Sequence, residues 1–247
     1  MSRYSSFSDD YYVNMNLNTE LNLPSERESV LHFFEQLQKK FPTMENFYSR
    51  ERHEYVLEED KERGQYRWVA SEPRRILSVH FNPPNEEAAL EQHRHVLDIA
   101  PYCLSIRPID CESINLTYGF DYSYRGNHNE WIAEARGVPP AFEKLADEPG
   151  VKFVSYEPAM QFTWADDCRV QARLGVETRT SIYQIRNDDY PDEQFSIYLT
   201  GRRYGISGSS DSLPEIVDQL STFCHELLDN YVIDNVLRPV QQAIAIK

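Results

Sequence analysis

Two stretches of this chain alternate apolar and polar residues over an unusual length. Residues 13–23 read V-N-M-N-L-N-T-E-L-N-L, and residues 114–124 read I-N-L-T-Y-G-F-D-Y-S-Y. Successive side chains of a β-strand point to opposite faces, so this alternation predicts two long strands with one face in the core. It also restricts the register, because a slip by one residue would turn every asparagine and aspartate inward.

Similar elements are expected after each stretch. After the first, Ser25 and Glu28 have the spacing of a helix capping box. The apolar residues of the helix that follows lie three and four positions apart: Val30, Phe33, Phe34, Leu37 and Phe41. Strands are then expected around residues 55–57, 65–70 and 75–81, followed by a second helix that Asn85 caps.

The second stretch is followed by a comparable series with longer connections. A helical segment is interrupted at Pro139 and Pro140. Five strands are then expected, at residues 152–156, 159–164, 170–177, 180–186 and 194–202. The acidic segment 187–193 is typical of a turn, so the last two strands should form a hairpin. Asp211 or Ser212 should cap a long final helix, and Pro239 should kink or stop it.

The order β-α-β-β-β-α, occurring twice, resembles the duplicated architecture of the TATA-box-binding-protein-like fold. This resemblance implies an α+β protein with a curved, mainly antiparallel sheet and helices on its convex side. A helix-grip fold, with a sheet around one long C-terminal helix, is the alternative. We expect a flexible leader at residues 1–10, a first half at 11–108 and a second half at 109–247, packed as one domain. Whether the halves share one continuous sheet stays open.

The net charge disfavours several classes of partner. The chain has 247 residues and a formal charge of −15, from 25 basic and 40 acidic residues that are spread through both halves. Such a surface repels phosphate backbones and anionic lipids, so we expect neither a nucleic-acid nor a membrane partner. With 13% aromatic residues the chain can still form a large core. No apolar run approaches the length of a membrane span.

The sequence contains no motif typical of a catalytic or metal site. His93 and His95 are two apart on a predicted helix and therefore point in different directions. The acidic segments 166–167 and 188–193 lack the spacing of a calcium loop. Residues 201–208, G-R-R-Y-G-I-S-G, lack the lysine of a P-loop. We therefore expect no catalytic residues, no metal and no cofactor. The four cysteines contain no C-x-x-C pair, which favours a reducing cytoplasm.

Two groups of residues could bind a ligand. Tyr118, Tyr122 and Tyr124 share one face of a strand, and Trp164 could join them from a neighbouring strand. A packed core explains these rings most simply, and a ligand groove on a concave sheet face is the alternative. Arg202 and Arg203 could bind an anion beside a helix N-terminus, although neutralising the acidic surface is the simpler role.

The best functional interpretation is a non-enzymatic cytoplasmic protein that serves as a binding or assembly surface. The end of the final helix is apolar on more than one face, so it could dock on a second subunit and form a homodimer. The expected interface residues are Tyr231, Val232, Val236 and Leu237. The alternative is a small-molecule-binding protein or an enzyme that uses the tyrosine-rich concave face.

Overall fold

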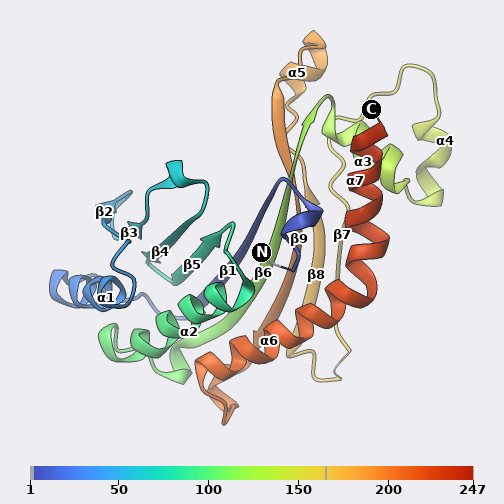
Figure 1. Cartoon of the computed structure of the whole chain (residues 1–247). Coiled ribbons are helices and arrows are strands. Elements are labelled where there is room, and N and C mark those ends of the chain that lie inside the picture. Colours follow the sequence, from blue (N-terminus) through green and yellow to red (C-terminus); the bar gives the residue numbers. More distant parts are fainter. Residues whose placement is uncertain (1–2, 165, 247) are drawn as a thin grey trace.

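The computed structural model describes residues 3–164 and 166–246 and is an α+β protein built on one curved, unclosed sheet (Figure 1). The described residues form nine strands in the order β2-β3-β4-β5-β1-β6-β9-β8-β7, and every neighbouring pair is antiparallel. The strands are β1 (Asp10–Thr19), β2 (Asn46–Ser49), β3 (Tyr55–Glu58), β4 (Tyr66–Glu72), β5 (Arg75–Phe81), β6 (Cys111–Arg125), β7 (Ala159–Phe162), β8 (Val170–Glu177) and β9 (Asp192–Tyr204). The expected α+β class and the curved, mainly antiparallel sheet are confirmed.

The helical elements differ widely in length. The α-helices are α1 (Arg27–Lys40), α2 (Glu86–Cys103), α3 (His128–Arg136), α4 (Glu143–Ala146), α5 (Ile182–Asn187), α6 (Leu213–Leu227) and α7 (Arg238–Ile246). A π-helix, η6 (Leu228–Leu237), joins α6 to α7. The short 3-10 helices are η1 (Ser5–Phe7), η2 (Lys61–Arg63), η3 (Pro108–Asp110), η4 (Pro140–Phe142) and η5 (Ile206–Gly208).

The two alternating stretches form the central strands β1 and β6, which pair with each other. Val13 lies opposite Tyr118, and both side chains are buried. On either side of this pair the strands follow in the order β5, β4, β3, β2 and β9, β8, β7. One sheet therefore runs through both sequence halves. The expected leader reaches the core, since Tyr4 is fully buried.

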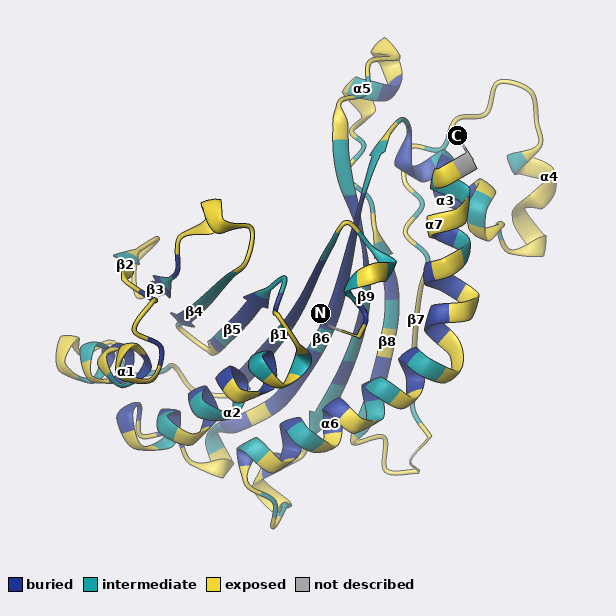
Figure 2. Ribbon diagram, in the orientation of Figure 1, coloured by how far each residue is buried: buried dark blue, intermediate teal, exposed yellow. Residues whose placement is uncertain are grey.

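Helices cover one face of the sheet, which we call the helix face. α2 lies on β5 and β1, α6 lies on β6 and β9, and α1 packs beside α2. Figure 2 shows that α2 and α6 turn their buried residues inward and their exposed residues outward. The opposite, open face carries the alternate residues of the same strands, such as Asn14, Thr117 and Thr200. These side chains are only half buried.

Two predicted strands in the second half are wrong. Residues 152–156 are irregular, because side chains of the α3 N-terminus provide their hydrogen bonds. Asn127 Nδ2 donates to the Phe153 carbonyl at 2.9 Å, and Asn129 Oδ1 accepts from the Tyr156 amide at 2.8 Å. Residues 182–187 form α5, because Ser181 and Gln184 make a capping box. The hairpin consequently joins β8 to β9, and α5 lies in its connection.

Two smaller differences concern the start of the first helix and the edge of the sheet. The first helix begins at Arg27, with Glu26 rather than Ser25 as its N-cap residue. β2 was not expected, and its four residues form one edge of the sheet. By contrast, the predicted caps Asn85 and Ser212 are confirmed by hydrogen bonds from the backbone amides of Ala88 and Glu215.

The chain remains helical at Pro239, where we expected a kink or a stop. Pro239 is the second residue of α7, and Arg238 separates it from the π-helix. A proline has no N–H to donate to the carbonyl four residues earlier. That carbonyl, on Asn235, instead accepts a hydrogen bond from the Arg136 side chain of α3. A side chain from another helix therefore satisfies the group that the proline leaves unpaired.

A close contact on the open face depends on a glycine in β6. The Tyr12 ring lies across Gly119, and its hydroxyl donates to Asp121 Oδ1 at 3.0 Å. A Cβ atom at position 119 would lie only 2.1 Å from Tyr12 Cε2. Burial raises the pKa of Asp121, so this tyrosine contact helps to keep a poorly solvated carboxylate ionised.

We expect Gly119→Ala to lower the free energy of unfolding by about 1–3 kcal/mol, because the new methyl group must displace the Tyr12 ring. Urea denaturation of the variant and the wild type measures this difference. Gly175→Ala is the matched control, since Gly175 is also a strand residue of the open face and a Cβ there would lie 3.4 Å from Ala159. Equal losses in the two variants would contradict the role of Gly119.

Candidate functional site

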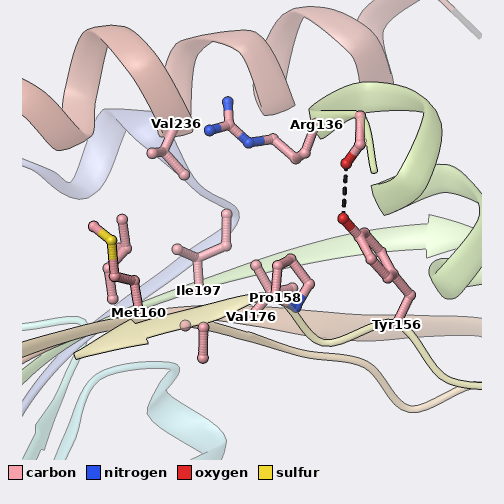
Figure 3. A pocket seen from close by; sticks show the side chains of 11 residues that line it. Arg136, Tyr156, Pro158, Met160, Val176, Ile197 and Val236 are labelled. Atoms are coloured by element: carbon pink, nitrogen blue, oxygen red, sulfur yellow. Dashed lines mark hydrogen bonds between the residues drawn. The ribbon is translucent and has the colours of Figure 1, made fainter. Parts of the chain in front are cut away.

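A hollow on the helix face lies between the C-terminal helix and the sheet edge (Figure 3). We call it the edge groove. β7 and β8 line one side of it, and η6 together with the end of α3 lines the other. Its volume is about 240 Å³. The lining residues are Arg136, Gly137, Tyr156, Pro158, Ala159, Met160, Leu174, Gly175, Val176, Ile197 and Val236.

The edge groove has few polar groups. The Tyr156 hydroxyl donates to the Gly137 carbonyl at 2.7 Å, the bond drawn in Figure 3. Arg136 is the charged lining residue, and it is held by the carbonyl of Asn235. The lining includes no carboxylate, thiol or imidazole that could act as a general base or a nucleophile. This arrangement is suited to binding an apolar group.

A second hollow of about 350 Å³ lies next to the edge groove and shares Tyr156 with it. The connection between α3 and β7 folds around this hollow. Large apolar side chains protrude from the α3–β7 connection, from β7 and the residues after it, and from η6, and each is more than half exposed. We call these residues the apolar face: Phe142, Leu145, Val154, Met160, Trp164 and Tyr231.

The four predicted interface residues divide into two groups. Tyr231 belongs to the apolar face and is exposed, whereas Val232, Val236 and Leu237 are buried within the chain itself. The second apolar side of the C-terminal helix has an intramolecular partner, because α3 packs against α7. The sequence shows that this side is apolar, but it does not show which surface covers it.

The predicted tyrosine groove falls within the core. Tyr118 is 0% exposed and Tyr122 is 2% exposed, so a ligand could reach neither ring without a rearrangement. Tyr124 packs against Trp131 of α3. Trp164 does not join these rings; its indole instead meets Phe223 of α6 edge-on, at 5.7 Å between ring centroids.

Tyr118 belongs to a polar cluster inside the helix face that sequence reasoning missed. Its hydroxyl lies 3.0 Å from His225 Nε2 and 3.1 Å from Ser221 Oγ. Glu86 Oε2 lies 3.4 Å from the same histidine nitrogen. The Tyr4 ring packs against both Tyr118 and His225. These residues come from distant parts of the chain, so no local motif could reveal the cluster.

The neighbouring cysteine is not an activated nucleophile. Cys224 is fully buried, and burial raises the pKa of its thiol to about 12. A thiolate is the reactive form, so this residue acts as a small apolar side chain. Burial also lowers the pKa of His225, which favours its neutral form. The cluster is best described as a hydrogen-bonded part of the core.

Arg202 and Arg203 point to opposite faces of β9. Arg202 lies on the open face, opposite Asn115, and Arg203 lies on the helix face, opposite Ile114. They cannot hold one anion together as a pair, because consecutive strand residues alternate in direction. Within the part of the chain that the structure describes, no three histidine, cysteine or acidic residues are placed to hold a metal ion. None of its helices has the length and hydropathy needed to cross a membrane.

Comparisons with known proteins do not identify a family. No family model matches the chain, and no curated protein matches it. Among solved structures, an alkyldihydroxyacetonephosphate synthase aligns with 95% of this chain and 42% of its own length, so this chain spans less than half of that protein. The sequence identity is 9% and the TM-score is 0.17, and at that score the alignment carries no argument about fold or function.

Two histidines are buried between α2 and the sheet. Ser78 Oγ accepts a hydrogen bond from Gln92 Nε2 at 3.0 Å and lies 2.9 Å from His93 Nδ1. The serine can therefore donate its own hydrogen to His93, which requires an unprotonated Nδ1. Burial lowers the pKa of His93 to about 3 and that of His80 to about 4, and the nearby Arg67 contributes at His80. Both rings are neutral in the folded protein.

We expect the free energy of unfolding to fall as the pH drops below about 6.5, the pKa of an unfolded histidine. Between pH 6.5 and the folded pKa values, near 4 for His80 and near 3 for His93, these two imidazoles bind protons in the unfolded chain but stay neutral in the folded chain. Each histidine contributes a slope of at most about 1.4 kcal/mol per pH unit. Urea denaturation between these pH values measures the slope.

The variant His93→Gln should reduce this slope by the contribution of one histidine, at most about 1.4 kcal/mol per pH unit. His32→Gln, at an exposed position, should leave the slope unchanged. If His93→Gln does not fold, an NMR titration of the wild-type imidazole resonances decides the question. Resonances for His80 and His93 that titrate near pH 6.5 would contradict the assignment.

Proposed function

We propose that this protein is a non-enzymatic assembly protein that forms a homodimer through the apolar face. The observation that supports this proposal is the position of protruding apolar side chains beside two apolar hollows. Met160 lines the edge groove and Phe142 lines the second hollow, yet both side chains are more than half exposed. Contiguous exposed apolar surface on a polar chain is typical of an interaction site.

The arrangement is suited to a twofold contact. In an isologous dimer the same patch of both subunits meets itself, so it must be self-complementary. A patch that carries side chains and hollows next to each other meets this requirement. The protruding Trp164 and Tyr231 of one copy can fill the hollows of the other copy. Aromatic anchors in pockets are also the residues that contribute most to protein interfaces.

Charge supports a second copy as the occupant. Two copies that each carry −15 repel one another, so contact is favoured where acidic residues are absent. The linings of the edge groove and the second hollow include no acidic residue, so the carboxylates nearest to the contact are those of neighbouring hollows, among them Glu226 beside Trp164 and Tyr231, and Glu143 and Asp147 beside the second hollow. The two linings do include two cations, Arg136 and Lys152.

The edge strand β7 adds a second mode of contact. β7 is the last strand of the sheet and pairs only with β8 among the described strands. Its outer backbone groups can therefore accept a further strand. Pairing of β7 with its copy would be antiparallel in a twofold dimer, and it would bring the two edge grooves together.

We also propose that the two halves are a duplication with the topology of the TATA-box-binding-protein-like fold. The sheet order supports matching β1 with β6, β5 with β9, β4 with β8 and β3 with β7. A helix follows each of the four strands nearest the centre: α1 after β1, α3 after β6, α2 after β5 and α6 after β9. β2 is then an addition to the first half.

We propose a cytoplasmic location for the protein. The four cysteines form no disulfide, in keeping with this proposal.

A small apolar ligand is the second candidate occupant. The two hollows, of about 240 and 350 Å³, lie near the lower end of the usual range for ligand sites. Native mass spectrometry of protein from its own host distinguishes the candidates. A mass twice that of the chain supports the dimer, and a small mass lost on denaturation supports the ligand.

We expect Met160→Glu to raise the dissociation constant of the dimer about tenfold or more, because the substitution places a carboxylate in an apolar contact. Trp164→Glu should have a similar effect. Analytical ultracentrifugation across the micromolar range measures both variants. Both positions are exposed in the single chain, so folding should be retained.

The control is Tyr102→Glu, at a tyrosine that is more exposed than either position but belongs to α2, away from the apolar face. This variant should dimerise like the wild type. A wild-type protein that is monomeric at every concentration would overturn the proposal, as would equal weakening by Tyr102→Glu and Met160→Glu.

A further inference from the structure

The open face carries a polar hollow that the proposed dimer does not use. Its volume is about 290 Å³, and it is lined by Gln161, Gln171, Ala172, Arg173, Thr200 and Arg202. Gln161 of β7 directly follows Met160, and the two side chains point to opposite faces of the sheet. The polar hollow and the edge groove therefore lie back to back on the same edge of the sheet.

The strand register brings the two arginines of this hollow together. Arg173 of β8 lies opposite Thr200 of β9, so Arg202 is its diagonal neighbour on the same face. Diagonal neighbours in an antiparallel pair are about 7–8 Å apart at Cα. Both side chains line the hollow. The Arg173 guanidinium lies beside Gly175, where a Cβ atom would be 3.5 Å from its central carbon, and because this side chain is exposed it can turn toward a ligand that Arg202 binds. Sequence reasoning found Arg202 but missed Arg173, because only the register places them side by side.

No carboxylate balances these two charges. The lining of the hollow contains no acidic residue, and among the described residues neither arginine forms an ion pair. This is unusual in a chain with 40 acidic and 25 basic residues. Like charges on neighbouring strand positions repel, so the arrangement costs stability unless an anion lies between them.

Hydrogen bonds within the protein fix the Arg202 side chain before any ligand binds. Arg202 Nε donates to Asn115 Oδ1 at 2.8 Å, and Nη1 donates to the Tyr204 hydroxyl at 2.8 Å. The guanidinium carbon also lies 5.6 Å from the centre of the Tyr204 ring. These contacts use Nε and Nη1, which leaves the Nη2 amino group to donate to a ligand. A fixed guanidinium loses less entropy on binding than a free one.

Neutral hydrogen-bonding groups complete the lining. Gln161 Nε2 donates to Gln171 Oε1, which joins the two amides across β7 and β8. The Thr200 hydroxyl is bonded to Thr117 of β6 at 2.8 Å. Amides and hydroxyls can donate to an oxyanion without adding charge. The lining thus combines two positive charges with neutral donors, a combination suited to an anionic group.

We propose that this hollow binds a small oxyanion, a phosphate or carboxylate group of a small molecule, between Arg173 and Arg202. Guanidinium groups recognise both kinds of oxyanion through paired N–H donors. The size of the hollow and the acidity of the rest of the surface favour a small molecule over a nucleic acid.

Isothermal titration calorimetry with inorganic phosphate, and separately with citrate, tests this proposal at an ionic strength held constant with sodium chloride. We expect saturable binding of at least one of the two anions. Tighter binding of phosphate identifies a phosphate-bearing ligand, and tighter binding of citrate identifies a carboxylate-bearing ligand. Arg173→Gln and Arg202→Gln should each weaken the binding about tenfold or more, since each removes a charged hydrogen-bond donor.

The matched control is Arg75→Gln. Arg75 also lies on the open face, but it is paired with Glu72 at 2.7 Å. The Arg75→Gln variant should bind the anion with the same affinity as the wild type. Arg173 is exposed, so Arg173→Gln should fold and decides the question even if Arg202→Gln does not. The proposal is overturned if neither anion binds saturably, or if Arg173→Gln and Arg75→Gln have the same effect. The dimer is tested by sedimentation of Met160 and Trp164 variants and the anion site by titration of Arg173 variants, so failure of one proposal can be told from failure of the other.

Discussion

The antiparallel ladder between β1 and β6 joins two strands that are far apart in the chain, and the rest of the sheet is arranged around it. This pairing places Val13 beside Tyr118 on the helix face and Tyr12 beside Gly119 on the open face. Because each further strand pairs outward from these two, the register of β1 and β6 determines which residues of the outer strands meet. A shift of this pairing by one residue would turn the core-facing side chains of the shifted strand to the opposite face of the sheet.

The two faces differ in how their polar groups are satisfied. Under the helices, some polar residues are partnered within the core, as Tyr118 is with His225 and Ser78 is with His93, whereas the His80 ring and the Tyr122 hydroxyl are buried without a hydrogen bond to the described part of the chain. On the open face, Asp121 accepts a hydrogen bond from Tyr12, and Arg202 is held by Asn115. Buried polar groups cost free energy when they are unpaired, so these networks restrict the core to one arrangement.

The edge formed by β7 and β8 is where both proposals meet. Its helix face is not fully covered by η6, which leaves Met160 exposed beside the edge groove. Its open face presents Arg173 without an acidic partner among the described residues. One short strand therefore borders an apolar site on one side and a cationic site on the other. The alternation of strand side chains separates the two chemistries.

The sequence by itself determined the two central strands, their apolar faces and the helix caps at Asn85 and Ser212, because each depends on neighbours within a few residues. It also indicated an α+β protein with an antiparallel sheet. Tertiary structure decided that residues 152–156 are irregular, since Asn127 and Asn129 provide their hydrogen bonds. It also decided that Tyr118 is buried and that Arg173 and Arg202 line one hollow. These outcomes depend on long-range register and on which helix covers which strand, and no local pattern encodes either.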